Sequence, residues 1–304
     1  MTDNIITELR DILASQMEKD MLMALMGNGV RRGSALGLTE GLMEKFGEDR
    51  LVETGPGSAL ALKLALGMAM DGMHPVVFIS QNDLVSSADI IVSNAAMLRE
   101  ISASQFSPRI LICAEYAESG SSRTSAGIYP ENIYGSAGNV RMAVPASPDR
   151  APELLRECLA SEGVSIFMAD RSLLAEPDGK DPFEGTAGGK DLTVICAGSS
   201  LGICAAACRR AADIGIGCDL IAEEDMSLSD MPRIVSSVSS TGRALIVHTE
   251  ATDTVSAMIS TAIMESEAFY YLYRPVRRMC LPMNVKEGTD PRNLIYEEIL
   301  KTAK

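Results

Sequence analysis

The sequence predicts an α/β protein made of two doubly wound domains, each with a mostly parallel sheet covered by helices. Short apolar runs alternate with helical patterns at the spacing typical of parallel β–α units. A breaker-rich segment at 176–191 interrupts this alternation and has the composition of an interdomain linker. The 304 residues, 46% of them hydrophobic, suffice for two cores. We expect a first domain over 1–178, a linker at 179–190 and a second domain over 191–304.

In the first domain, helical periodicity and short apolar runs indicate ten elements. The first helix has apolar residues at Ile5, Leu9 and Leu13 and continues through a methionine-rich stretch to Met26, and Thr39 is the expected cap of the second helix. The expected helices cover 4–26, 38–47, 58–71, 86–102 and 150–161, and the expected strands cover 50–53, 75–79, 109–115, 140–145 and 165–169.

In the second domain, the alternation restarts after the linker. We expect strands in the apolar runs at 192–198, 218–222 and 243–251, and helices at 199–215 and 291–302. The pattern again predicts a parallel sheet with helices between its strands.

Charge and hydropathy exclude several kinds of partner. The net charge of −14 and the pI of about 4.7 argue against binding to nucleic acid or to an anionic membrane surface. The longest apolar region, around 60–70, contains Lys63 and is too short to span a bilayer. The N-terminus carries acidic residues with helical periodicity, so we do not interpret it as a signal peptide.

Cysteine usage indicates a reducing compartment. The seven cysteines are odd in number and scattered through apolar segments, which is typical of buried thiols in a cytoplasmic protein. Cys204 and Cys208 share a helix face, but the sequence places no third or fourth ligand near them. We therefore expect no zinc site, because structural zinc takes four closely organised ligands.

The stretch VETGPGSALALKLALGMAMDG, residues 52–72, contains the most informative turn. An apolar run passes through Gly-Pro-Gly into a long helix that starts at Ser58. The unpaired N–H groups of a helix's first turn can bind a ligand, so the helix mouth at 55–58 is a candidate site for a small anion. Serine is also a favoured N-cap, and we expect Ser58 to cap this helix.

Other catalytic patterns are absent from the sequence. It contains two histidines, no Walker motif and no G-x-G-x-x-G after a strand, so nucleotide binding through those loops is unsupported. The glycine- and serine-rich stretch at 118–127 is either a surface loop or a loop that lines a site beyond the carboxyl end of a strand.

The order of several segments carries a family resemblance. The first domain contains, in this order, the segments ITELRDILASQMEKD, LMGNGV, LTEGLMEKFGEDRLVET, GMAMDGMHPVVFI, DIIVSNAAMLR and VPASPDRAPELLRECL. In this order they resemble the beta subunit of thiamine-diphosphate-dependent 2-oxo acid dehydrogenases of the pyruvate and branched-chain type. The second-domain segments LTVICAGSSLGICAAACRRAADIGI and TGRALIVHTEA are similar to the transketolase C-terminal domain, and the likeness weakens over the last forty or so residues.

The resemblance implies a shared cofactor site. A transketolase-like pyrimidine-binding domain in the beta subunit would bind the aminopyrimidine ring of thiamine diphosphate, and an alpha chain would hold the diphosphate through Mg²⁺. The alpha-type Gly-Asp-Gly signature does not occur here, so this chain would supply half of the site and no metal ligands. The implied partners are an alpha-type subunit in an alpha2-beta2 assembly and a lipoyl-bearing acyltransferase core, and a homodimer is the alternative assembly.

The resemblance also assigns site positions by alignment. The glutamate that relays protons to the pyrimidine falls on Ser58, and the acidic element falls on residues 27–30, which include Asn28. The aromatic residue that packs on the ring falls on Leu84 or its neighbours. The two family histidines fall in the Arg123–Ala126 run, at Thr124 and Ala126. A serine hydroxyl can donate one hydrogen bond to a ring nitrogen but cannot cycle a proton as a tuned carboxyl does.

Three residues remain candidates for chemistry at this site: Glu53 as a substitute carboxylate, Ser58 itself, and Arg123 as a cation for a substrate carboxylate. Three functions therefore stay open. The chain is a working beta subunit with an atypical site, a catalytically degenerate homologue with an assembly or regulatory role, or a binding protein for a small anion at 55–58.

Overall fold

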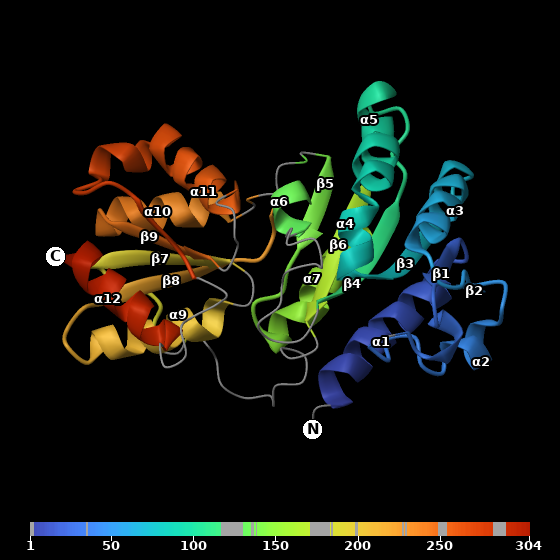
Figure 1. The fold of residues 1–304 in the computed structure, drawn as a ribbon, viewed down its shortest axis with the longest axis horizontal. Coiled ribbons are helices and arrows are strands. Elements are labelled where there is room, and N and C mark those ends of the chain that lie inside the picture. The colour runs from blue at the N-terminus through green and yellow to red at the C-terminus, as the bar shows by residue number, and fades with distance from the viewer. Residues whose placement is uncertain are drawn as a thin grey trace. The chain divides into compact units, whose positions relative to one another are not determined.

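The computed structural model describes residues 3–34, 36–116, 130–134, 137, 139–170, 183, 185–197, 200–226, 228, 230–248, 254–281 and 290–304. The chain divides into two compact units, Met1–Asp178 and Gly179–Lys304. Each unit contains one parallel sheet with helices packed on it (Figure 1). The predicted fold class, α/β with two doubly wound units, is confirmed.

The first sheet has six strands in the order β2-β1-β3-β4-β6-β5, and every neighbouring pair is parallel. The central strands are near-continuous apolar runs because helices cover both faces of the sheet. The strands are β1 (Met23–Gly27), β2 (Leu51–Glu53), β3 (His74–Ser80), β4 (Ile110–Tyr116), β5 (Val140–Ala143) and β6 (Val164–Asp170).

Helices α1 and α7 pack together over one face of this sheet, where their side chains form a continuous core with β1, β3 and β4. Helix α3 contacts β1 and β3 and also packs on η2. The helical elements are α1 (Asp3–Lys19), η1 (Val30–Arg32), α2 (Leu42–Phe46), α3 (Ser58–Met70), α4 (Gln81–Ser86), η2 (Asp89–Ala96), α5 (Met97–Ile101), α6 (Pro130–Tyr134), η3 (Pro148–Arg150) and α7 (Ala151–Ala160).

The first helix is shorter than predicted. We expected it over 4–26, but α1 ends at Lys19 and Met23–Gly27 form strand β1, between β2 and β3. All five residues of β1 are buried. A strand buried on both faces is an unbroken apolar run, which periodicity alone cannot distinguish from a buried helix.

The second helix also differs from the prediction. Helix α2 covers only Leu42–Phe46, and it begins after Gly41 without a side-chain cap. Thr39, the expected cap, is fully buried. Its hydroxyl donates a hydrogen bond to the carbonyl oxygen of Val30 at 2.7 Å, so Thr39 holds the loop after β1 in place.

The second sheet has four parallel strands in the order β10-β9-β7-β8. The sequence predicted β7, β8, β9, α9 and α12, whereas α10, α11 and β10 were missed. The elements are β7 (Leu192–Ala197), α9 (Leu201–Ala212), β8 (Cys218–Glu223), α10 (Met231–Thr241), β9 (Ala244–His248), α11 (Thr254–Glu265), η5 (Glu267–Tyr271), β10 (Arg277–Cys280) and α12 (Pro291–Ala303).

Part of the segment assigned to the linker belongs to the second unit. Gly189 donates a backbone hydrogen bond to Cys218 at 3.2 Å, and Leu220 donates one to Thr186 at 2.8 Å. Thr186 is buried. The end of the predicted linker therefore pairs with β8, and residues 171–182 lie outside the described part of the chain.

Four cysteines lie together in the core of the second unit. Cys204 lies within hydrogen-bond reach of Cys196, and Cys208 within reach of Cys218. The expectation that no further thiol lies near Cys204 and Cys208 was wrong, because β7 and β8 bring Cys196 and Cys218 against α9. These contacts and burial raise the pKa of both helix thiols far above the usual range.

All seven cysteines are free thiols. Among the described residues, no group of three or more histidine, cysteine or acidic side chains could hold a metal ion. No helix in the described ranges has the length and apolar character needed to cross a membrane.

Candidate functional site

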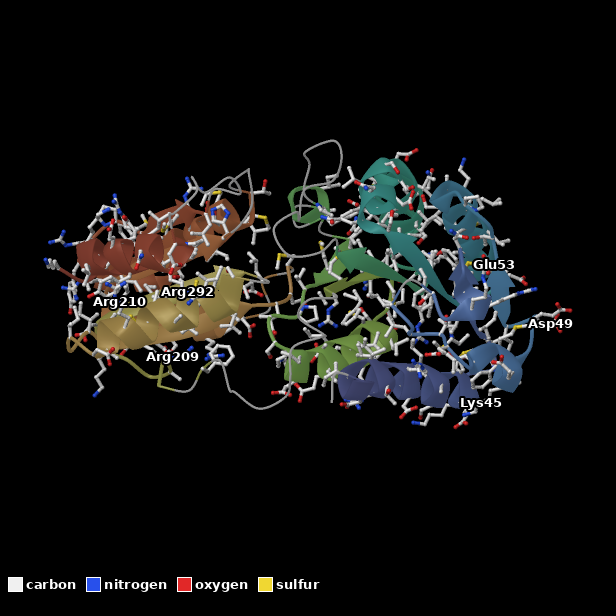
Figure 2. The ribbon with its side chains drawn as sticks, turned by 60° about the horizontal axis from the view of Figure 1, so that its bottom comes forward. Lys45, Asp49, Glu53, Arg209, Arg210 and Arg292 are labelled. Carbon is white, nitrogen blue, oxygen red and sulfur yellow. The ribbon has the colours of Figure 1, made fainter. Side chains whose placement is uncertain are left out.

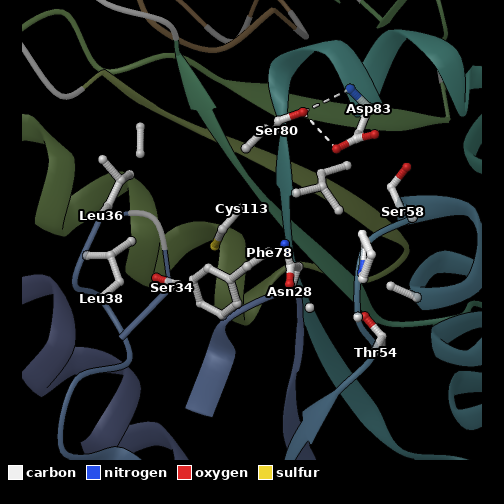
Figure 3. A pocket seen from close by; sticks show the side chains of 18 residues that line it. Asn28, Ser34, Leu36, Leu38, Thr54, Ser58, Phe78, Ser80, Asp83 and Cys113 are labelled. Carbon is white, nitrogen blue, oxygen red and sulfur yellow. Dashed lines mark hydrogen bonds between the residues drawn. The ribbon is translucent and has the colours of Figure 1, made fainter. Parts of the chain in front are cut away.

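A cavity of about 360 Å³ opens at the carboxyl ends of β1 and β3 (Figure 3). The chain runs from β1 outward to β2 and then returns to the other side of β1 to form β3, so these two strands flank a topological switch point. Ligands of open parallel sheets bind in the crevice at such a point. The loop after β2, the start of α3 and the start of α4 complete the wall.

Ser58 lies in this wall but does not cap α3. The N-cap residue is Gly57, and it provides no side-chain cap hydrogen bond. Ser58 is the first helical residue, and its hydroxyl lies 3.2 Å from that of Ser87, which is buried. The predicted cap was therefore wrong, and the first-turn N–H groups of α3 receive no side-chain cap at the cavity.

Two hydroxyl oxygens of cavity-lining residues have no hydrogen-bond partner among the described residues. Ser34 Oγ and Thr54 Oγ1 are buried and make no hydrogen bond within the described part of the structure, and both residues line the cavity. Ser34 also adopts a left-handed backbone conformation, with φ of 57°, which is uncommon for a residue other than glycine. Buried hydroxyls are normally hydrogen-bonded. These two oxygens are inaccessible to solvent, so they are unpaired polar groups inside the wall and not contacts for a ligand in the cavity.

The upper wall in Figure 3 carries the single carboxylate among the lining residues that the structure describes, Asp83. Ser80 Oγ donates to Asp83 Oδ2 at 2.7 Å, and the backbone N–H of Asp83 donates to Ser80 Oγ at 3.2 Å. This reciprocal pair caps the start of α4. The aromatic ring in the wall comes from Phe78.

The structure brings together some of the residues assigned by alignment and separates others. Asn28 and Ser58 line the cavity. Leu84 does not: it is fully buried, and its carbonyl oxygen accepts a hydrogen bond from Tyr134 at 2.7 Å. Arg123, Thr124 and Ala126 lie outside the described residues.

Glu53 is directed away from the cavity. Its Oε1 accepts a hydrogen bond from the Gly29 N–H at 2.6 Å, and its Oε2 lies 3.5 Å from the Arg31 N–H. Glu53 is the last residue of the edge strand β2 and is labelled in Figure 2. The carboxylate thus fixes the loop after β1, and Glu53 is not among the lining residues.

Sequence reasoning missed Phe78 as a wall residue and gave no role to Asp83, a neighbour of Leu84. Both lie at the carboxyl end of β3 or just beyond it, the position where ligands of parallel sheets bind. That topological signal could have found them, but alignment to a single aromatic position pointed to Leu84 instead.

The free hydroxyl of Thr54 leads to a stability prediction. Replacing Thr54 with valine keeps the shape of the side chain and removes a buried hydroxyl that has no partner. We expect the ligand-free Thr54→Val variant to be more stable by about 1 kcal/mol, because an unsatisfied buried polar group carries a desolvation cost. Denaturant unfolding of the ligand-free chain measures this, and a loss of stability would show that the hydroxyl is satisfied in solution.

Comparison with known protein families identifies both units. The model of the transketolase pyrimidine-binding domain matches residues 4–177, and that of the transketolase C-terminal domain matches residues 184–301. The chain belongs to the transketolase pyrimidine-binding family. Its cavity lies in the family's pyrimidine-binding domain.

Curated relatives of this transketolase-like chain span most of its length. The beta subunit of mitochondrial 2-oxoisovalerate dehydrogenase from Dictyostelium discoideum is 28% identical over 97% of this chain and 82% of its own length. The corresponding subunit from Bacillus subtilis is 27% identical over 89% and 86%. The beta subunit of the mitochondrial pyruvate dehydrogenase E1 component from Pisum sativum is 28% identical over 89% and 80%.

Solved structures support the same fold. A split-gene transketolase described as an inactive beta4 tetramer superimposes with a TM-score of 0.72 at 15% identity, covering 98% of this chain and 97% of the other. Transketolase from Leishmania mexicana superimposes with a TM-score of 0.63 at 12% identity, covering 98% and 43%.

The family implies thiamine diphosphate, and the cavity fits one part of that role. The Phe78 ring and the polar side chains of Asn28 and Ser58 line the cavity and offer apolar and polar contacts to a flat ring with nitrogen atoms. The resemblance assigns the proton-relaying glutamate to Ser58, and Glu53 is not among the lining residues. The described residues therefore fit binding of the ring, and Asp83 is the one carboxylate that they contribute to the wall.

Proposed function

We propose that this chain is the beta-type subunit of a 2-oxo acid dehydrogenase decarboxylating component and binds the pyrimidine end of thiamine diphosphate. The observation that carries the proposal is the cavity at the carboxyl ends of β1 and β3, which is lined by the Phe78 ring, by Asn28 and by Ser58 at the start of α3. The names of the relatives support the subunit type. An alpha-type chain supplies the diphosphate site and Mg²⁺, and a lipoyl-bearing acyltransferase core is the expected larger partner.

Calorimetric titration with thiamine diphosphate and Mg²⁺ tests the binding role. The full-length chain is titrated alone and after mixing with an alpha-type chain, and we expect cofactor binding in the mixture. Ser58→Ala should weaken binding about tenfold, because the loss of one hydrogen bond to a buried ligand corresponds to roughly 1–1.5 kcal/mol.

Ser239→Ala is the matched control for this titration, since it also removes one hydroxyl. Ser239 lies on α10 in the second unit, where its hydroxyl donates to the carbonyl oxygen of Val235 at 2.8 Å. The control should bind the cofactor as the original chain does. Equal affinity of the Ser58→Ala variant, or no binding in the mixture, would contradict the proposed site.

The second candidate function is a catalytically degenerate homologue with an assembly or regulatory role. Ser58 favours this function. The resemblance assigns a carboxylate to this position, whereas the side chain here is a hydroxyl that lies 3.2 Å from the Ser87 hydroxyl. In this case Ser58→Glu should restore little decarboxylation in the mixture with an alpha-type chain, because catalytic groups that act as a unit are non-additive. Large activity from the single variant would contradict the degenerate role.

Ser58→Glu should not destabilise the chain. Ser58 makes no cap hydrogen bond, so no cap is lost, and a carboxylate in the first turn of a helix stabilises by about 0.3–1 kcal/mol. Denaturant unfolding at neutral pH checks this alongside the activity assay.

The third candidate function is binding of a small anion at the start of α3, residues 55–58, without a cofactor. The uncapped first turn favours it. Titration with inorganic phosphate distinguishes it, because phosphate would then bind to the chain alone. We further propose a cytoplasmic location, which the seven free cysteines support.

A further inference from the structure

Asp83 is the only charged side chain among the cavity-lining residues that the structure describes. The other described lining residues are apolar side chains, glycines, a thiol and uncharged polar groups, with no lysine, arginine or histidine among them. An ionised carboxylate accepts hydrogen bonds and donates none. The wall therefore favours a ligand that brings a hydrogen-bond donor to Asp83.

One oxygen of the Asp83 carboxylate is held in place and the other is available. Ser80 Oγ donates a hydrogen bond to Oδ2 at 2.7 Å (Figure 3). Within the described part of the chain Oδ1 has no hydrogen-bond partner. Asp83 is half-buried, and Oδ1 does not belong to the buried polar atoms that lack a partner. This oxygen is therefore accessible to a ligand.

Asp83 lies on the side of α4 that approaches the start of α3. Ser87 follows Asp83 by one helical turn, and its backbone N–H donates to the Asp83 carbonyl oxygen at 3.0 Å. The Ser87 hydroxyl lies 3.2 Å from that of Ser58, and side chains four residues apart share a helix face. Asp83 and Ser58 therefore belong to the same part of the wall, on neighbouring helices.

The aminopyrimidine ring that the proposed function places in this cavity carries one kind of hydrogen-bond donor. Its unprotonated ring nitrogens are acceptors, and its exocyclic amino group donates. A carboxylate oxygen attracts the amino group and repels an unprotonated ring nitrogen, because both of those atoms carry partial negative charge. The amino group is thus the part of the ring that matches Asp83.

We propose that Asp83 makes this cavity specific for a ring with an exocyclic amino group, and that its Oδ1 accepts a hydrogen bond from that group. The inference rests on the proposed function, because it concerns the orientation of the ring that the cavity binds. Ser80 is a positioning residue, since its hydroxyl holds Oδ2. The Ser58 hydroxyl on the neighbouring helix donates to a ring nitrogen.

Calorimetric titration of the full-length chain, mixed with an alpha-type chain and Mg²⁺, tests this role with two ligands. One is thiamine diphosphate, and the other is its analogue with a carbonyl oxygen in place of the exocyclic amino group. Both carry the same diphosphate, so the ratio of their dissociation constants reports on the ring end. We expect the original chain to bind the amino ligand about tenfold more tightly, the effect of one hydrogen bond.

The Asp83→Asn variant should reverse this preference. The Ser80 hydroxyl donates to the oxygen of the new amide as it does to Oδ2, which directs the amide nitrogen to the place of Oδ1. An amide nitrogen donates, so it pairs with the carbonyl oxygen of the analogue and repels the amino group. We expect an affinity about tenfold lower for the amino ligand and about tenfold higher for the analogue.

Asp71→Asn is the matched control, because it makes the same change of charge at the far end of α3. Asp71 is exposed, follows the last residue of this helix and is not a lining residue. The 13 residues of α3 extend over about 20 Å, so the control should keep the original preference. Circular dichroism should show an intact fold for both variants, since asparagine has the size of aspartate.

Four results would overturn the proposal. Equal binding of both ligands by the original chain would mean that Asp83 does not meet the amino group. An unchanged preference in Asp83→Asn would assign the selection to another residue, and an equal shift in Asp71→Asn would reduce it to net charge. These three results leave cofactor binding in place. A mixture that binds neither ligand would instead overturn the proposed function together with this inference.

Discussion

Replacement of Gly27 with alanine should destabilise the first unit by about 3 kcal/mol or more. Gly27 ends β1 beside the cavity, with φ of 150°, a conformation that L-residues rarely adopt. An added Cβ atom would lie 2.5 Å from the carbonyl oxygen of Phe78. That oxygen belongs to the backbone of the paired strand β3, so it cannot move aside as a flexible side chain could.

Denaturant unfolding of the full-length chain, followed by circular dichroism, measures this loss. Gly202→Ala is the control, because Gly202 is a helical residue in α9 and an added Cβ atom would meet nothing within 4 Å. The control should be neutral or stabilising by up to about 1 kcal/mol. Equal stability of Gly27→Ala and the original chain would mean that β1 and β3 can separate at the cavity without cost.

The Glu223→Gln variant should remove a pH dependence of stability that the original chain shows. Glu223 is fully buried at the end of β8, and its Oε2 has no hydrogen-bond partner in the described structure. Burial, together with the nearby carboxylates of Asp230, Asp225 and Glu224, raises the pKa of Glu223 from 4.5 to about 8. The folded chain therefore retains a proton that the unfolded chain releases.

The direction of the effect follows from this difference in pKa. The stabilising contribution of the protonated carboxyl is fully present below pH 4.5 and is lost progressively as the pH rises to about 8. Between pH 6 and pH 8 the original chain should lose about 2 kcal/mol more stability than Glu223→Gln, since one pKa unit corresponds to about 1.4 kcal/mol. The amide keeps the shape of the side chain and does not ionise.

Unfolding curves at pH 6, 7 and 8 for both proteins measure this difference. Glu297→Gln on α12 is the control, because Glu297 is exposed and its loss should leave the pH dependence unchanged. If the difference in unfolding free energy between Glu223→Gln and the original chain were constant across these pH values, Glu223 would be ionised in the folded state at pH 6.

Much of the fold could be predicted from local sequence. The strands β3, β4 and β6 are unbroken apolar runs between breakers, and α7 and α12 show clear start and stop residues, so their boundaries were close to the observed ones. Strand β1 was missed because MALMG continues an apolar helical pattern. Strand β10 was missed because it has the pattern RRMC, with two exposed arginines, and only its pairing with β9 makes it a strand.

The sequence pointed to the place of the candidate site in the fold, but it did not predict which side chains contact one another there. The Gly-Pro-Gly turn before α3 pointed to the start of that helix, and Ser58 does line the cavity. The roles of Ser58 and Glu53 depend on side chains from distant segments. The Ser58 hydroxyl lies within hydrogen-bond distance of the Ser87 hydroxyl, and the Glu53 carboxylate accepts a hydrogen bond from the loop after β1.

The sequence by itself determined the two-unit α/β class and the family, because each depends on residue order alone. Only the tertiary structure decided that Ser34, Thr54 and Phe78 meet in one cavity, and that Cys196 and Cys218 lie against α9. Such groupings join residues far apart in the chain. Strand order and helix packing determine these groupings, and no local sequence pattern indicates which strand ends become neighbours.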